Sequence, residues 1–511
     1  MKSDKLKIFR GSFFSLTLFS LAEKVIAYIY QATMAAVLGA GALTDCYSAA
    51  SQLFDLIDST ILSAMVIATL RKYNEVRSSG EDRGQSLLAN VNSCLAIIMF
   101  AFSILVLIFS RPISYVIAPG FSADIRDNLV LCIRIMCVIP TIMAFTTVKQ
   151  VLLRHNRHFI VVNSRSLCIS VSGLVVLAIA SLVNPQTSAL LCIGYVVSSL
   201  LFLFVLGISS KRFETISLVK PKINAEIKSL LKLAVPTIMS SGIVRVSLMI
   251  DQIIASSSIN GSVSCLYYSQ QLYHIVSGFL IVNLSMIILT DFMKLAVNNS
   301  YAEIILRMRK AISSILLLLL PVTIITLVFS KEIVIIAFQR GAFGQEATLQ
   351  VSTLLFFYAI GFVAELFNTV FTQVLYSFGK TKTAMINSLI AMSINIVTSI
   401  VLTRIIGIAG IAIGTSISQI CEIPFSRSAV KKCVPSYKSS VGLQYTSKLI
   451  ISAIVGTVAV LLIKTLQLGA MLSFILATLL MFFVFWSMLL LLKEETAKGY
   501  FNSFVNTLKK K

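Results

Sequence analysis

Charged residues are scarce in this chain of 511 residues. Asp, Glu, Lys and Arg together make up 13 % of it, about half the share of an ordinary soluble domain. Hydrophobic residues make up 57 %, and apolar runs of about 20 residues, each long enough to cross about 30 Å of hydrocarbon, recur along the whole length. These proportions exclude a string of soluble domains and predict an all-α membrane protein that crosses the bilayer many times.

Residues that carry catalytic or metal chemistry are few as well. The chain has 3 histidines, and its 9 cysteines lie mostly in apolar runs without a Cys-x-x-Cys pair. It contains no Walker A, Gly-x-Ser-x-Gly or His-Glu-x-x-His motif. The sequence therefore predicts no enzyme, no metal site and no cofactor. Without an NTPase site, any work done across the membrane would draw on the membrane potential, a monovalent ion or a solute gradient.

The net charge of +22 comes from 43 basic against 21 acidic residues. Most of the basic residues fall on alternate connections between apolar runs and at both termini. Short basic loops of this kind stay in the cytoplasm. The pattern argues against nucleic acid as a partner, and it predicts a multi-pass membrane protein with both termini cytoplasmic.

Fourteen apolar spans fit the sequence, with a basic connection after each even-numbered span. The apolar stretch of the first span is too long for a cleaved signal peptide, so we expect this span to be retained. The predicted spans lie at 12–38, 44–70, 86–110, 127–149, 160–182, 187–209, 229–257, 263–293, 311–330, 349–378, 383–403, 408–428, 447–465 and 468–492.

An internal repeat appears at an offset of 219–224 residues. Three pairs of segments carry it: Cys46 with Gln52-Leu-Phe54 and Cys265 with Gln271-Leu-Tyr273, Arg111-Pro-Ile and Lys331-Glu-Ile, Gln150–Ser164 and Gln373–Ser388. The offset covers six spans, an even number, so both copies share one orientation, and a binding site is expected between them. We predict two parallel six-helix lobes, 1–210 and 211–430, followed by two further spans and a basic cytoplasmic tail in 431–511.

Charges inside the first two apolar spans are the strongest functional signal. A charge at the centre of a membrane helix costs roughly 2.5–3.5 kcal/mol on insertion scales, so such residues usually face a cavity or a partner. We interpret these residues as the lining of a polar cavity in a transporter, with structural ion pairing as the alternative. They are Glu23, Lys24, Asp45, Asp55 and Asp58.

The segment Gly39-Ala-Gly-Ala-Leu-Thr-Asp45 resembles the first-loop motif of the MurJ (MviN) lipid II flippases, members of the MOP exporter superfamily. The likeness covers spans 1–12 in register. Further segments that resemble this family are Ala118-Pro-Gly-Phe121, Gly261–Tyr268, Gln339-Arg-Gly-Ala-Phe343, Tyr358-Ala-Ile-Gly361 and Tyr376–Thr383, although Lys380 and Ala384 depart from its pattern at the last of these.

The resemblance implies a V-shaped, two-lobed MOP fold that flips a polyprenyl-diphosphate-linked glycan precursor across the bacterial inner membrane by alternating access. In that family, arginines in spans 1, 2 and 8 bind the diphosphate, and spans 13 and 14 form a groove for the lipid tail. A fixed arginine suits this task because its planar guanidinium can bind a phosphate through two parallel hydrogen bonds. The implied partners are the lipid-linked glycan, membrane lipids and proteins of cell-envelope biosynthesis.

This sequence departs from the family at the arginine positions, while Asp45 is retained. The four positions carry Lys24, Tyr30, Asp58 and Gln271 instead. Arg245, midway along span 7, is the candidate that restores a second cation; a structural pair with Asp251 or another nearby acid is the alternative. We expect Lys24, Arg245, Asp45, Asp58, Gln271 and Tyr30 to bind substrate, and Glu23, Asp55, Asp251 and Glu365 are candidates for ion coupling.

Three other functions remain open at this point. One is export of O-antigen or another lipid-linked polysaccharide unit, although the two extra spans favour the MurJ type. A second is drug export coupled to a cation, as in MATE transporters, with the acidic residues of spans 1 and 2 binding the ion. A third is a scaffold in a cell-envelope complex that transports nothing, since the arginines are lost.

Overall fold

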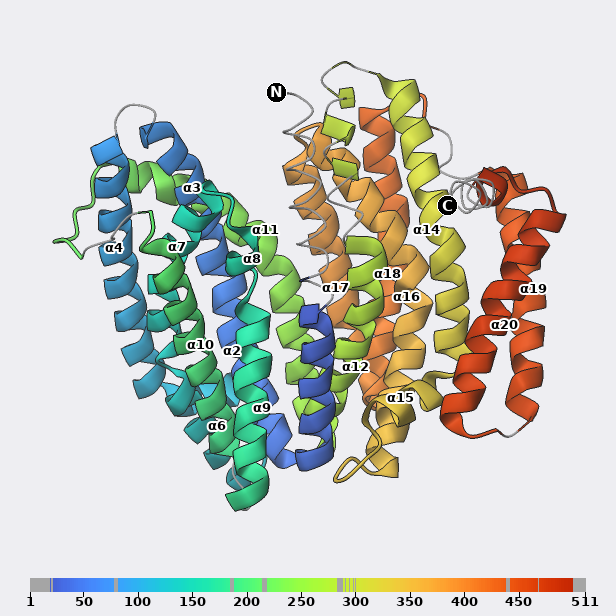
Figure 1. Cartoon of the computed structure of the whole chain (residues 1–511), viewed down its shortest axis with the longest axis horizontal. Coiled ribbons are helices and arrows are strands. Elements are labelled where there is room, and N and C mark those ends of the chain that lie inside the picture. The colour runs from blue at the N-terminus through green and yellow to red at the C-terminus, as the bar shows by residue number, and fades with distance from the viewer. Residues whose placement is uncertain are drawn as a thin grey trace. The chain divides into compact units, whose positions relative to one another are not determined.

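The computed structural model describes most of the chain: residues 19, 22–77, 81–183, 188–213, 218–282, 288–289, 291–293, 295–296, 298, 300–437, 442–466 and 468–499. The start of the predicted first span and the end of the basic tail lie outside these residues. Every regular element in the described ranges is a helix, as predicted (Figure 1).

Nine helical stretches in the described part of the chain are long and apolar enough to cross a membrane. The longest is 42–77, and the most apolar include 82–108 and 301–328. This confirms a polytopic helical membrane protein. The count of fourteen spans remains a prediction.

The chain divides into two compact units. The first consists of Met1–Ser264 with Arg340–Phe343, and the second of Cys265–Gln339 with Gly344–Lys511. The lobe boundaries at 210 and 430 remain a prediction.

The first unit is a helical bundle in which α7 packs against α4, α10 and α3, and α2 packs against α6 and α10 (Figure 1). Its buried residues are mainly apolar, with many Ser and Thr side chains and a few charged ones among them. Its helices are one over residues 22–38, α2 (Ala42–Ile57), the π-helix η1 (Asp58–Leu62), α3 (Ser63–Arg77), α4 (Glu81–Ile108), α5 (Ser110–Ile117), α6 (Ala123–Met136), α7 (Ile139–His155), α8 (Phe159–Val162), α9 (Arg165–Val183), α10 (Ser188–Ser210) and α11 (Ala225–Ser256).

In the second unit, α18 packs against both α16 and α17, while α19 and α20 pair with each other and contact α14. The last two helices correspond to the predicted spans 13 and 14. The elements are α12 (Ser262–Ser277), which begins in the first unit, the π-helix η2 (Gly278–Val282), α14 (Tyr301–Val328), α15 (Ser330–Phe338), α16 (Gln345–Ser377), α17 (Thr381–Ile406), α18 (Ala409–Cys433), α19 (Leu443–Thr465) and α20 (Ala470–Leu491).

The internal repeat is visible in the bounds of the helices. Shifting α2, η1 and α4 by about 220 residues gives the bounds of α12, η2 and α14, and α5 and α15 also start about 220 residues apart. The two π-helices therefore occupy the same position in the two copies. Since π-helices are rare and usually short, their recurrence at one register confirms the repeat.

The segments around Gly39 and Gly341, both part of the family-like motifs, contact each other through their backbones within the first unit. The amide of Ala342 donates a hydrogen bond of 2.8 Å to the carbonyl of Ala36. Gly39 and Gly341 have φ of +66° and +58°. A Cβ at either position would collide with a carbonyl oxygen of the other segment. Only glycine combines a positive φ with so close an approach.

Candidate functional site: a charged pocket in the first unit

The π-helix η1 shapes the acidic end of the site. Asp55 lies in the last turn of α2, and Asp58 begins η1. The Ser59 hydroxyl donates to the Asp55 carbonyl at 2.6 Å, and the Thr60 hydroxyl donates to the Leu56 carbonyl. Such bonds satisfy backbone groups at a helix irregularity in a membrane, where water cannot replace a missing partner.

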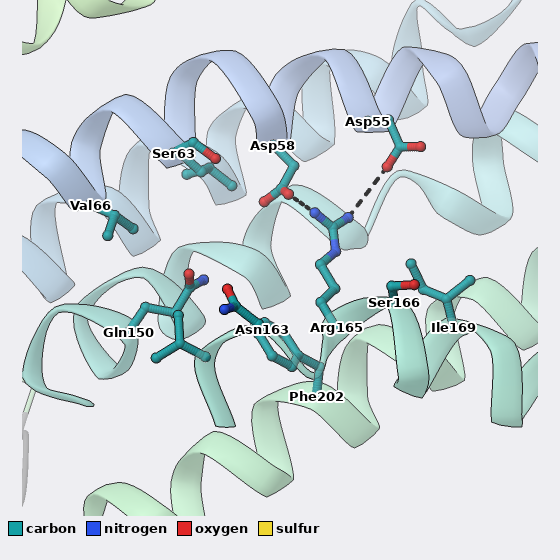
Figure 2. A pocket seen from close by; sticks show the side chains of 12 residues that line it. Asp55, Asp58, Ser63, Val66, Gln150, Asn163, Arg165, Ser166, Ile169 and Phe202 are labelled. Atoms are coloured by element: carbon teal, nitrogen blue, oxygen red, sulfur yellow. Dashed lines mark hydrogen bonds and ion pairs between the residues drawn. The ribbon is translucent and has the colours of Figure 1, made fainter. Parts of the chain in front are cut away.

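A single arginine joins both aspartates to a second helix. Arg165, the first residue of α9, forms an ion pair with Asp58 through Nη1, and its Nη2 lies 3.4 Å from Asp55 Oδ1 (Figure 2). The Tyr195 hydroxyl of α10 donates to the same Asp55 oxygen at 2.5 Å. The charged residues thus tie α2 and η1 to α9 and α10.

These side chains line a pocket of about 330 Å³. The exposed fraction of the side chain is 12 % for Asp58, 23 % for Arg165 and 45 % for Asp55, so the ion pairs are partly open to the pocket. Two carboxylates face one guanidinium, which leaves an excess of negative charge for ligand groups that are cationic or donate hydrogen bonds. The remaining lining residues are Leu62, Ser63, Val66, Gln150, Val162, Asn163, Ser166, Ile169 and Phe202 (Figure 2).

The structure brings together two predicted site residues, Asp55 and Asp58, with one that the sequence interpretation missed. Arg165 lies inside the predicted span 160–182, and a charge within an apolar span was the very signal that marked Asp58. The sequence could therefore have marked Arg165 as a candidate site residue. The sequence could not show that Arg165 pairs with Asp55, because the two residues are 110 positions apart.

The two candidate cations lie exposed on separate helices of the first unit. Lys24 lies on the helix 22–38, and Arg245 lies near the middle of α11. Asp251 is buried on the same helix as Arg245. Glu23 is half-buried beside Lys24. Substrate binding by these cations, and ion coupling by Glu23 and Asp251, remain predictions.

Asp45 caps a helix in the structure. Its Oδ2 accepts from the Gly261 amide at 2.7 Å and its Oδ1 from the Ser264 amide at 2.6 Å. These amides lie at the N-terminus of α12, where backbone donors lack helical partners and a carboxylate is favoured. The side chain is 2 % exposed. A direct contact between Asp45 and substrate remains a prediction.

Tyr30 is packed inside the first unit. Its hydroxyl lies 3.2 Å from that of Tyr47, and its ring lies against Gly173 of α9, where any Cβ would collide with it. The residue at this family arginine position therefore fills space between helices. A role in binding remains a prediction.

In the second unit, the remaining predicted residues lie on α12 and α16. Gln271 is half-buried on α12. Glu365 of α16 accepts a hydrogen bond of 2.6 Å from the Tyr273 hydroxyl, and the Tyr273 ring stacks on Phe362 with centroids 5.2 Å apart. This carboxylate is held by an aromatic cluster, and its role in ion coupling remains a prediction.

An apolar pocket of about 220 Å³ lies in the second unit. Leu272, Ile275 and Val276 of α12 line it, so the helix that corresponds to α2 in the repeat faces an apolar pocket, whereas α2 faces a charged one. Helices α14, α15, α16 and α20 supply the rest of the lining: Val322, Ile325, Thr326, Ile333, Leu355, Phe474, Thr478 and Phe482.

Within the described residues, no group of three or more His, Cys, Asp or Glu side chains could hold a metal ion.

Comparison with known proteins places these features in a family context. The model of one family, described as lipid II flippase MurJ, matches residues 34–482. Among curated proteins, a probable lipid II flippase MurJ of Rhizobium tropici is 25 % identical over 411 residues, covering 78 % of this chain and 76 % of its own. A probable lipid II flippase MurJ of Rickettsia prowazekii (strain Madrid E) is 23 % identical, covering 79 % and 80 %.

Solved structures show the same fold. A lipid II flippase MurJ in an inward closed conformation superimposes with a TM-score of 0.79 at 20 % identity, covering 93 % of this chain and 98 % of its own. An inward-facing multidrug resistance MATE family transporter of the MOP superfamily gives a TM-score of 0.65 at 12 % identity, covering 81 % and 96 %. At these identities the likeness shows the fold alone.

Proposed function

This chain belongs to the MurJ family of lipid II flippases, and on that premise we propose that it moves a polyprenyl-diphosphate-linked glycan precursor of peptidoglycan across the bacterial inner membrane by alternating access. Its multi-pass helical architecture suits this task. The positive-inside pattern of its connections supports cytoplasmic termini.

The proposal rests on a difference between the two copies of the repeat, which line pockets of different polarity. Helix α2 faces an ion-paired polar pocket in the first unit, and its counterpart α12 faces an apolar pocket in the second. A lipid-linked glycan has these two parts, a polar head and a hydrocarbon chain. A drug exporter for small amphiphilic molecules would not need them separated.

In this proposal, Asp58 and its neighbours in the charged pocket contact the sugar or peptide part of the substrate. Hydroxyl, amide and ammonium groups would find acceptors in Asp55, Asp58 and Asn163. The diphosphate needs cations, and Lys24 and Arg245 are the exposed candidates in the first unit. Gln271 on α12 would add a neutral hydrogen-bonding group in the second unit.

The hydrocarbon chain would lie along the apolar pocket of the second unit. Phe474, Thr478 and Phe482 of α20 form part of its wall. This contribution gives the additional C-terminal helices a role in binding the lipid tail. Because the tail enters this pocket from hydrocarbon and not from water, van der Waals packing against these side chains would hold it there.

Energy for transport would come from the membrane potential or a monovalent ion. Moving one elementary charge through 100 mV is worth about 2.3 kcal/mol, so a translocating diphosphate couples strongly to the potential. Glu365, held by Tyr273 inside the second unit, is the carboxylate we assign to ion or proton coupling.

Complementation tests the proposed function. The gene is expressed in a bacterium whose own lipid II flippase can be switched off, and growth and wall synthesis are followed after depletion. We expect rescue, with loss of rescue in the K24Q/R245Q variant. Failure of the wild-type protein, shown to be folded and inserted, would instead point to another lipid-linked glycan as substrate.

A further inference from the structure

A basic hollow of about 780 Å³ lies at the end of α18, and it shares no lining residue with either pocket described above. It belongs wholly to the second unit. Among the described residues, its lining combines two cations, two hydroxyl side chains and several apolar side chains, and none of these residues is acidic. The lining residues are Ile423, Pro424, Arg427, Ser428, Lys431, Pro435 and Tyr437.

The two cations share one face of α18. Arg427 and Lys431 are four residues apart, which brings their Cβ atoms within about 6 Å on a helix. Both side chains are exposed at the hollow, and Ser428 adds a hydroxyl beside them. An anion at this point would therefore meet two positive charges and a hydrogen-bond donor.

The rest of the hollow is a rigid apolar wall. Pro424 and Pro435 carry no backbone donor and have fixed φ. The ring of Tyr437 is 2 % exposed and packs edge-on against Phe371 of α16, with centroids 6.2 Å apart. Such a wall suits the glycerol and first acyl carbons of a lipid better than a freely soluble ion.

We propose that this hollow binds the headgroup phosphate of an anionic membrane phospholipid. It lies where α18 passes from apolar sequence to the basic connection before α19, which is the depth expected for a headgroup in a chain that spans the membrane. Basic pockets at such positions attract anionic lipids. This site is distinct from the transport pathway proposed above and does not depend on it.

The strongest rival explanation is a general one. Cations in the last turn of a helix complement its dipole, and Lys431 and Lys432 both lie there. Lys432 is exposed but does not line the hollow. Substituting Lys432 therefore tests whether binding needs the hollow or only positive charge at the end of the helix.

The test uses the purified full-length protein in a zwitterionic lipid environment. Phosphatidylglycerol is titrated in, and bound lipid is counted by native mass spectrometry. Two variants that each lose two charges are compared, R427Q/K431Q at the hollow and K382Q/K432Q nearby, since Lys382 is exposed in the first turn of α17. We expect the first pair to weaken binding about tenfold or more and the second by less than about twofold.

Three results would overturn the proposal. They are equal binding of phosphatidylglycerol and phosphatidylcholine, equal losses in the two double variants, and binding of inorganic phosphate as tight as that of the lipid. Thermal unfolding of both variants is measured alongside, and the single variant K431Q serves if R427Q/K431Q does not fold. Because lipid binding is read without transport, the result stands apart from the flippase proposal.

Discussion

At the scale of single residues, the charges inside the first unit fall into two kinds. Both carboxylate oxygens of Asp45 accept hydrogen bonds from backbone amides at the start of α12. Asp55 and Asp58 instead share Arg165 at the edge of a pocket. Removing one partner of such a pair leaves the other unpaired in a poor solvent for charge, which costs more than the pair itself contributes.

The variant R165Q should therefore lower the free energy of unfolding by about 2 kcal/mol, less than the roughly 3–5 kcal/mol of a fully buried pair because Arg165 is partly exposed. Thermal unfolding in detergent measures this change. The double variant R165Q/D58N should recover part of the loss, since it removes one of the unpaired acids. Equal stability of R165Q and the wild type would show that the pair is not structural.

Substitution of the capping aspartate gives a second residue-scale prediction. In D45N the side chain keeps one acceptor oxygen for two amides, so the variant should lose about 1–2 kcal/mol of stability. The control is D127N, whose partner Arg111 lies 3.5 Å away in an exposed pair and whose loss should cost less than about 1 kcal/mol. If D45N is no less stable than D127N, the cap contributes nothing measurable.

At the scale of helices, the π-helix η1 is the feature that recurs at the same register as η2. It positions Asp58 and ends next to Ser63, and both residues line the charged pocket. A π-turn holds one more residue than the α-turn it replaces. A deletion within it can therefore be absorbed without rotating the helix that follows.

Deleting Thr60 should convert η1 to α-helix while α3 keeps its register. We expect the protein to insert and fold, with transport reduced at least about tenfold because the pocket lining is displaced. Deleting Ala68, buried in α3, should instead rotate the rest of that helix and prevent folding. Expression, thermal unfolding and transport are measured for both. If the two deletions impair folding equally, η1 is not an inserted turn.

The helices themselves were largely predictable from the sequence, because apolar runs and basic connections follow directly from the bilayer. The repeat was also detectable, through matched segments such as those at Arg111 and Lys331. The π-helices were not, since no residue pattern distinguishes them from α-helix. Tertiary pairing was equally hidden, and the bond from Asp45 to Gly261 spans 216 positions of the chain.

At the scale of the whole molecule, family membership and fold agree, while the residues at the family's arginine positions do not. Tyr30 is packed between helices, and Asp58 is paired with Arg165. Of the four positions only Lys24 carries a cation. The proposed function therefore requires that Lys24 and Arg245 alone bind the diphosphate, which relatives are expected to bind through arginines.

The most direct measurement is transport of labelled lipid II by the purified protein in liposomes, compared with the K24Q/R245Q variant and with K382Q/K432Q as the matched two-charge control. We expect transport by the wild type and the control, and a loss of at least about tenfold in K24Q/R245Q, since two charge-assisted contacts to phosphate are removed. Unchanged transport in K24Q/R245Q would contradict this expectation.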